Sequence, residues 1–224
     1  MPGAAAVAIW CDVDPAIREE FDDWHAHEHM PERLALPGFL RGSRWVSADG
    51  GKGYFILYEV AALETLTSAP YLARLNDPTP WSRKMMAYHL NMTRSLCAVR
   101  ATFGSGLADV LLTLRFSPRP ESADGLIQWL SLELLPKLPT RRGLVCAHLL
   151  QDAATTQAAP TTEQKIRGGD KTADWVLLVI GYGTDAIARL AAEELNEGAL
   201  VAHGASPGSI ARIYKFAYAL ATRP

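Results

Sequence analysis

Two stretches of the chain share a spaced pattern, and that pattern decides the fold. They are Trp24-His25-Ala26-His27-Glu28-His29-Met30-Pro31 and Trp129-Leu130-Ser131-Leu132-Glu133-Leu134-Leu135-Pro136. Trp, Glu and Pro coincide when the second stretch is set back by 105 residues (129 minus 24), and the same offset places Gly143 on Gly38. Self-similarity at a fixed offset predicts two copies of one supersecondary unit.

The flanking sequence predicts the same order of elements in each copy. In the first copy we expect strands at 4–11, 39–47, 53–60 and 93–103, with helices at 15–30 and 63–75. In the second copy we expect strands at 109–116, 144–151, 175–181 and 210–220, with helices at 121–138 and 185–195. Asp14 caps the first helix, and Pro31 ends or kinks it. Each copy is therefore βαββαβ, the order of a ferredoxin-like fold.

The predicted fold class is α+β, with two ferredoxin-like repeats fused in one chain and packed into an α+β barrel. Packing sheet to sheet removes the apolar sheet face that a single repeat would expose. We expect residues 1–105 to carry the candidate active site and residues 106–224 to serve mainly as scaffold. Two segments break the symmetry: the polar stretch 152–172, expected to be a mobile surface loop, and the stretch 76–91.

Composition excludes several classes of protein. The 224 residues are 49% hydrophobic and 21% charged with a net charge of -2, which is typical of a globular protein. The charges are mixed and form no basic stripe, so no nucleic-acid partner is expected. No apolar run approaches the roughly 20 residues of a membrane span. Three widely spaced cysteines indicate reduced thiols and a cytoplasmic location.

The histidine-rich helix holds the candidate catalytic residues. At 100° per residue, Trp24 and Glu28 fall on its apolar stripe, while His25 and His29 lie together along one edge. Burial raises the pKa of a carboxyl group, and a histidine titrates near neutral pH, so both suit proton transfer. We expect His29 to act as the base or acid, with His25 and Glu28 assisting it; His27 is expected to be solvated.

Two other readings of this helix remain open. Glu28 could be structural and pair with Arg33, Arg41 or Arg44, because the second copy keeps a glutamate at this position but no histidine. His25-x-x-Glu28-His29 also matches a short zinc-binding pattern, which would need a third ligand.

Further pocket residues are expected outside this pattern. Trp24, Trp81, Tyr88, His89 and Arg94 are the candidate substrate-binding residues. Aromatic side chains line apolar pockets, and the guanidinium of Arg94 could bind a carboxylate or a phenolate. Met85 and Met86 are expected to pack in the core, and some tyrosine hydroxyls on the strands could face a cavity.

Longer motifs in the first copy resemble a known group of proteins. They are Glu20-Phe21-x-x-Trp24-x-x-x-Glu28-His29-x-Pro31-Glu32-Arg33-x-x-x-Pro37-Gly38-Phe39, Pro78-Thr79-Pro80-Trp81-Ser82-Arg83 and Asn91-Met92-Thr93-Arg94. This pattern resembles the dimeric α+β barrel superfamily, in particular EthD-like and related uncharacterised ferredoxin-like proteins. The superfamily includes cofactor-free monooxygenases, isomerases, cyclases and haem enzymes. The resemblance implies a small-molecule pocket between sheet and helices, and permits a homodimer.

These observations together lead to a functional hypothesis. We expect an enzyme without an organic cofactor that acts on a small aromatic or apolar metabolite by His/Glu acid–base chemistry. It would be a lyase, isomerase or cyclase, or a cofactor-free monooxygenase. The alternatives are a protein that binds a small ligand without turnover, and a metal- or haem-dependent enzyme that uses the helix of His25, Glu28 and His29.

Overall fold

The computed structural model describes residues 1–153 and 159–222. Its eight strands are hydrogen-bonded in the order β1-β3-β2-β8-β5-β7-β6-β4, which is that of a closed barrel. Helices are interspersed among these strands along the chain. The predicted α+β barrel is therefore confirmed. The chain divides into two compact units: the first unit comprises residues 2–98, 153–172 and 217–224, and the second comprises Met1 and residues 99–152 and 173–216.

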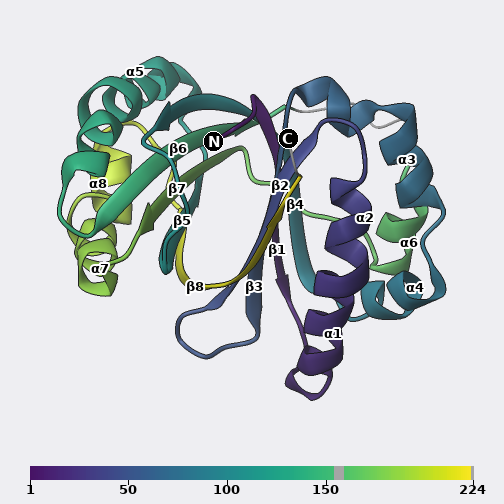
Figure 1. The fold of residues 1–224 in the computed structure, drawn as a ribbon. Coiled ribbons are helices and arrows are strands. Elements are labelled where there is room, and N and C mark those ends of the chain that lie inside the picture. Colours follow the sequence, from purple (N-terminus) through teal and green to yellow (C-terminus); the bar gives the residue numbers. More distant parts are fainter. Residues whose placement is uncertain (154–158, 223–224) are drawn as a thin grey trace. The chain divides into compact units, whose positions relative to one another are not determined.

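In the first unit, one face of an antiparallel sheet is covered by helices (Figure 1). Strand β1 lies between β3 and β4, and β2 pairs with β3. The strands are β1 (Ala5–Asp12), β2 (Phe39–Ser47), β3 (Gly53–Val60) and β4 (Leu90–Phe103), and the helices are α1 (Arg18–Trp24), α2 (Met30–Leu34), α3 (Ala69–Asn76), α4 (Pro80–Met86) and α6 (Thr162–Ile166). Short 3₁₀ turns cover Pro15–Ile17 and Leu63–Thr67.

The second unit is built from the later part of the chain. Strand β5 lies between β7 and β8, and β6 pairs with β7. The strands are β5 (Val110–Phe116), β6 (Leu144–Asp152), β7 (Trp175–Gly181) and β8 (Ile210–Ala221), and the helices are α5 (Ala123–Gln128), α7 (Thr184–Glu193) and α8 (Glu197–Ala202). Short 3₁₀ turns cover Pro120–Ser122 and Leu135–Thr140. Leucines dominate the core of this unit.

The two stretches that match in sequence adopt the same unusual local structure. Each contains a π-helical turn, at His25–His29 and at Trp129–Leu134. The widened turn ends with a backbone N–H that reaches five residues back, from Met30 to His25 and from Leu135 to Leu130. A proline follows each turn, and its ring would clash with the carbonyl of a regular helix. The wider turn relieves that clash, so Pro31 neither ends nor breaks the helix.

The matched glycines also share a conformation. Gly38 has a φ of 86° and Gly143 a φ of 90°, in the left-handed region that side chains disfavour. A Cβ on Gly38 would lie 2.6 Å from Thr65 Oγ1, and one on Gly143 would lie 2.7 Å from Ala186 Cβ. Both glycines precede a strand, so the shared spacing marks a turn that each unit requires.

The expectation of a mobile loop at 152–172 is wrong for its later part. Thr161 and Gln164 form a capping box at the start of α6, and Glu163 on this helix is buried. Buried polar contacts, described below, hold the helix in place. Residues 154–158 of the predicted loop lie outside the described residues.

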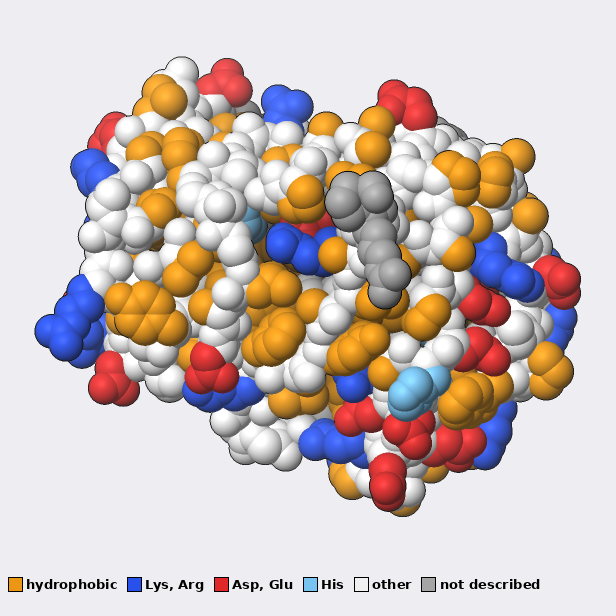
Figure 2. Space-filling view, viewed as in Figure 1, with side chains coloured by type: hydrophobic (Ala, Val, Ile, Leu, Met, Phe, Trp, Pro, Cys, Tyr) orange, Lys and Arg blue, Asp and Glu red, His pale blue; other side chains and the backbone are white. Residues whose placement is uncertain are grey.

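Charged side chains of both signs are interspersed over the face in Figure 2, and acidic ones gather where Figure 1 places α1. That helix begins with Glu19 and Glu20 and ends near Asp22 and Asp23. None of the helices in the described ranges combines the length and the apolarity that crossing a membrane requires.

Candidate functional site

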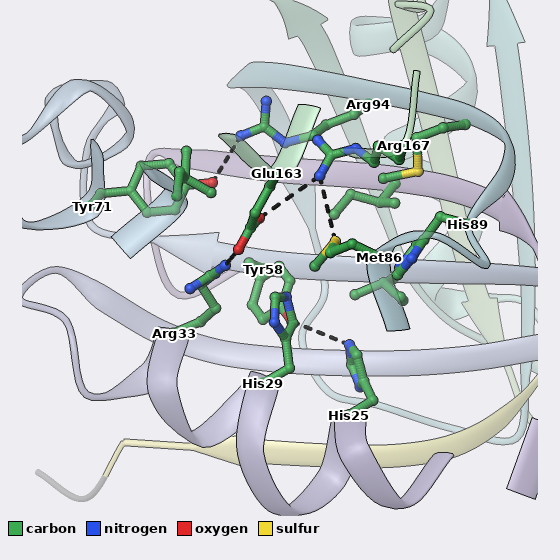
Figure 3. Close-up of a pocket in the computed structure, with 14 residues that line it drawn as sticks. His25, His29, Arg33, Tyr58, Tyr71, Met86, His89, Arg94, Glu163 and Arg167 are labelled. Carbon is green, nitrogen blue, oxygen red and sulfur yellow. Dashed lines mark hydrogen bonds and ion pairs between the residues drawn. The ribbon is translucent and has the colours of Figure 1, made fainter. Parts of the chain in front are cut away.

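A small polar cavity lies in the first unit between the sheet and its helices (Figure 3). Its walls are Ile9, His25, His29, Arg33, Ile56, Tyr58, Tyr71, Leu75, Met86, His89, Met92, Arg94, Glu163 and Arg167. The free space is about 30 Å³, which holds one or two water-sized molecules. Side chains must therefore move to admit a larger ligand, and the unbranched methionines of the wall are suited to doing so.

One helix face supplies three of the polar walls. His25, His29 and Arg33 follow one another at four-residue spacing across the π-helical turn and α2, and all three are buried. The rings of His25 and His29 lie 5.7 Å apart, measured between centroids. The expected pairing of these histidines on one edge is confirmed, and the π-helical turn directs both into the cavity.

The histidines of this cavity are neutral at physiological pH. Burial, together with the positive charge of Arg33, lowers the pKa of His29 well below its ordinary value. Burial and the nearby Arg44 do the same to the pKa of His25. Burial lowers the pKa of His89 to about 4. Neutral imidazoles can accept a proton, so each ring is in the form that a general base requires.

Hydrogen bonds distinguish the three rings. His89 Nδ1 donates to the carbonyl of Met85 at 3.1 Å, which leaves its Nε2 with a lone pair. His25 Nε2 lies 3.2 Å from the hydroxyl of Tyr58. The ring of His29 contacts Trp24 at 4.5 Å between centroids, and its buried Nδ1 has no hydrogen-bond partner among the described residues. His29 is thus the least committed base of the three.

Three arginines and one carboxylate, that of Glu163, are among the other residues that line the cavity. Arg33 and Glu163 form an ion pair that is buried at both ends, and Arg167 Nη1 lies 3.7 Å from the same carboxylate. Asp170 accepts two hydrogen bonds from Arg167, at 2.7 and 2.8 Å. Although burial raises it, these contacts hold the pKa of Asp170 below its ordinary value. Arg94 donates to the hydroxyl of Tyr71 at 2.8 Å.

Several predicted site residues lie outside the cavity walls. Glu28 accepts hydrogen bonds from Thr79 at 2.6 Å and from Ser82 at 3.2 Å, which attach the π-helical turn to the start of α4. The alternative in which Glu28 pairs with an arginine does not hold, because Arg33, Arg41 and Arg44 pair with Glu163, Glu59 and Asp22. Glu28 and Trp24 both contact Ser82, so Glu28 lies on the Trp24 side of the turn and not among the cavity walls with His25 and His29.

The predicted aromatic residues do not line the cavity either. Trp24 is fully buried and donates from its indole nitrogen to Ser82 at 3.2 Å. Trp81 packs against the core, and Tyr88 is 37% exposed. His89 and Arg94, by contrast, are both brought into the cavity. His27 is exposed as expected, beside Asp23.

Sequence reasoning missed part of the cavity. Arg33 and Met86, which the sequence suggests only as a partner of Glu28 and as a core residue, both line the cavity. Glu163 and Arg167 fall in the stretch expected to be a loop. The signal for them was present, because Thr161-Thr162-Glu163-Gln164 has the pattern of a capping box and predicts a helix start.

The cavity does not fit a haem group. A haem group would need a far larger rearrangement of the walls than a small aromatic ligand, and His25 Nε2 already contacts the hydroxyl of Tyr58. Glu28 does not converge with His25 and His29 on a common point, as the zinc pattern requires. Across the described ranges, no group of three or more His, Cys, Asp or Glu side chains is placed to hold a metal ion.

The second unit has an apolar face at the equivalent place. The offset of 105 residues carries His25, His29 and Arg33 onto Leu130, Leu134 and Leu138. All three leucines are buried in the core of their unit. The same helix position is therefore filled by hydrocarbon in one unit and by two imidazoles and a guanidinium in the other.

Comparisons with known proteins bear on the fold. No protein-family model matches the sequence, and no curated protein matches it significantly. An anthrone oxidase-like protein of known structure is 12% identical, with a TM-score of 0.66 over 97% of this chain and 92% of its own. A proposed monooxygenase from Fusobacterium nucleatum subsp. nucleatum is 8% identical, with a TM-score of 0.64 over 99% and 96%. One from Lactobacillus acidophilus is 6% identical, with a TM-score of 0.60 over 97% and 95%.

These likenesses show a shared fold and no more, because the identities are low. The structures are those of ferredoxin-like α+β barrel proteins, in agreement with the broader resemblance drawn from the sequence. The narrower resemblance to EthD-like proteins stays a prediction.

Proposed function

We propose that the cavity of the first unit is an active site in which His29 removes a proton from a carbon acid. The observation that carries the proposal is the neutral His29 ring, which faces a cavity also lined by buried arginines. A neutral base takes the proton, and the nearby positive charge stabilises the carbanion or enolate that forms. The apolar walls select a small aromatic or apolar substrate.

The internal comparison supports a functional rather than a structural role. Polar and charged groups in a protein interior are destabilising unless they are fully paired, and leucines serve the same packing position in the second unit. Replacing a leucine face by His25, His29 and Arg33 sacrifices stability. Such a sacrifice is typical of a site under functional constraint.

Oxygen is the proposed second substrate. Two of the proteins that share this fold are described as an anthrone oxidase-like protein and a proposed monooxygenase, which prompts this choice. After deprotonation, the carbanion transfers electrons to dioxygen and a carbon–oxygen bond forms. The resulting peroxide anion takes up the proton held by His29 and becomes a hydroperoxide. Loss of the second C–H proton and cleavage of the O–O bond then release water, so a methylene group and dioxygen become a carbonyl group and water.

Without oxygen, the same first step gives a lyase or an isomerase. Return of the proton to another carbon isomerises the substrate, and departure of a neighbouring group completes an elimination. The two outcomes share His29 as the base and differ in whether oxygen is consumed, so one assay separates them.

The ketone probe for this proposal is anthrone, a tricyclic ketone with an acidic methylene group. We expect the protein to accelerate oxygen uptake and quinone formation above the rate of spontaneous oxidation. His29→Leu should return the rate to that background, whereas Leu132→Ala, at an exposed position of the second unit, should leave it unchanged. Acceleration that survives in His29→Leu would refute the role of His29.

A further inference from the structure

Arg94 is a buried cation without an anionic partner. Its side chain extends from β4 into the cavity and is 7% exposed. Among the described residues, its guanidinium has one hydrogen-bond partner, the hydroxyl of Tyr71, and no carboxylate lies within 4.0 Å of it. A buried charge that has no ion pair is stabilised less than a paired one, so the guanidinium of Arg94 is available to an anion that enters the cavity.

The neighbouring carboxylates form ion pairs with other arginines, although the charges of Asp170 and Glu163 help to keep the pKa of Arg94 high. Glu163 is paired with Arg33 and lies near Arg167, and Asp170 is paired with Arg167. Three arginines therefore face two carboxylates, and the histidines of the cavity are neutral. These five groups carry one positive charge in excess, and Arg94 is the arginine among them that has no ion pair.

The hydroxyl of Tyr71 provides a second hydrogen-bond donor beside the guanidinium of Arg94. Tyr71 Oη accepts the hydrogen of Arg94, so the hydroxyl proton of Tyr71 is free to donate. Two adjacent donors, one of them charged, match the two oxygens of a carboxylate. In the view of Figure 3, Arg94 and Tyr71 lie apart from His25 and His29, with Glu163 between them.

We propose that Arg94 and Tyr71 form an anion subsite that binds the carboxylate of the substrate, and that the substrate is a small aromatic carboxylate. The inference rests on the proposed function, since it places the carboxylate at this subsite and the reacting carbon toward His29. Glu163 tunes the subsite by neutralising Arg33. It thereby leaves the cavity with a single positive charge, which suits a monoanion rather than a dianion.

The test compares benzoate with benzamide, its neutral isostere, by isothermal titration calorimetry on the full chain. We expect benzoate to bind at least tenfold more tightly than benzamide. Arg94→Met should abolish that preference. Tyr71→Phe should lower the affinity for benzoate by a few-fold. Arg94→Lys is the second variant, for use if Arg94→Met proves unstable. It keeps the positive charge but not the paired N–H donors of the guanidinium, and it should retain part of the preference for benzoate. Arg100→Met, at an exposed position of the same strand, is the matched control.

Equal binding of the two probes, absence of benzoate binding, or a preference that survives in a folded Arg94→Met variant would overturn the subsite. Failure of the proposed function gives a different result. In that case benzoate still binds through Arg94, whereas His29→Leu processes the ketone probe as fast as the unmodified protein does.

Discussion

Arg33 and Glu163 form a buried ion pair although 130 residues separate them in the sequence. Glu163 lies on α6, in the connection between β6 and β7, and the helix belongs to the first unit rather than to the strands that flank it. A wall of the candidate site is therefore supplied by a distant segment. Because a buried charge left without its partner is destabilising by roughly 3 kcal/mol or more, this pair attaches α6 to the cavity.

Exchanging His29 for leucine separates a functional from a structural role. In the His29→Leu variant we expect the free energy of unfolding to stay the same or to rise by up to about 2 kcal/mol, because an apolar side chain suits a buried position. The reverse exchange in the second unit, Leu134→His, should lower it by roughly 3 kcal/mol. Denaturant unfolding measures both. A large loss of stability in His29→Leu would show that the imidazole is structural.

The buried histidines make stability depend on pH. Above pH 6.5 the His89 ring is neutral in both states, so it contributes no pH dependence. Between pH 6.5 and the folded pKa of about 4, the unfolded chain takes up a proton that the folded chain does not, and stability falls as the pH falls. For His89 alone the loss is roughly 3 kcal/mol.

Thermal unfolding from pH 7 to pH 4 checks this, with His89→Gln as the comparison because carboxyl groups also titrate in the range. As the pH falls, the unmodified protein should lose more stability than the His89→Gln variant does. If the stability of the two proteins fell in parallel with pH, the His89 ring would not be buried in its neutral form.

The glycines at matched positions should both resist substitution. Gly38→Ala and Gly143→Ala force an alanine into the left-handed region, which is unfavourable by about 1–2 kcal/mol, and each added Cβ meets a neighbour at under 3 Å. Gly125→Ala is the control, because it lies within α5 with open space around it; it should stabilise by roughly 0.5–1 kcal/mol. If alanine changed the stability equally at all three positions, the turn at Gly38 and Gly143 would not require glycine.

Glu28 should prove structural. Glu28→Gln keeps an oxygen that accepts from Thr79 and Ser82, so stability and turnover of the ketone probe should change little. Glu28→Ala removes that acceptor and should lower stability by about 1–2 kcal/mol without abolishing turnover. Comparing turnover by the two variants at a temperature where both are folded is the check. Loss of activity in Glu28→Gln would restore Glu28 as an acid or base.

Local patterns predicted the fold well because strands and turns depend on neighbouring residues. The 105-residue offset located the helix of His25 and His29, and also Gly38 and Gly143. The helical wheel groups Glu28 with Trp24, and both residues do contact Ser82, but spacing within the helix cannot reveal that Thr79 and Ser82 of a later segment hold the carboxylate. Glu163 was missed because its burial depends on Arg33, a contact that sequence spacing does not reveal.

The most direct test of the account is proton exchange under nitrogen, which isolates the first chemical step from oxygen. The ketone probe is incubated with the protein in deuterated water, and deuterium uptake at its methylene group is followed by NMR. We expect exchange well above background for the unmodified protein, and at least a tenfold loss in His29→Leu while benzoate binding at Arg94 persists. Exchange by His29→Leu at the unmodified rate would contradict it.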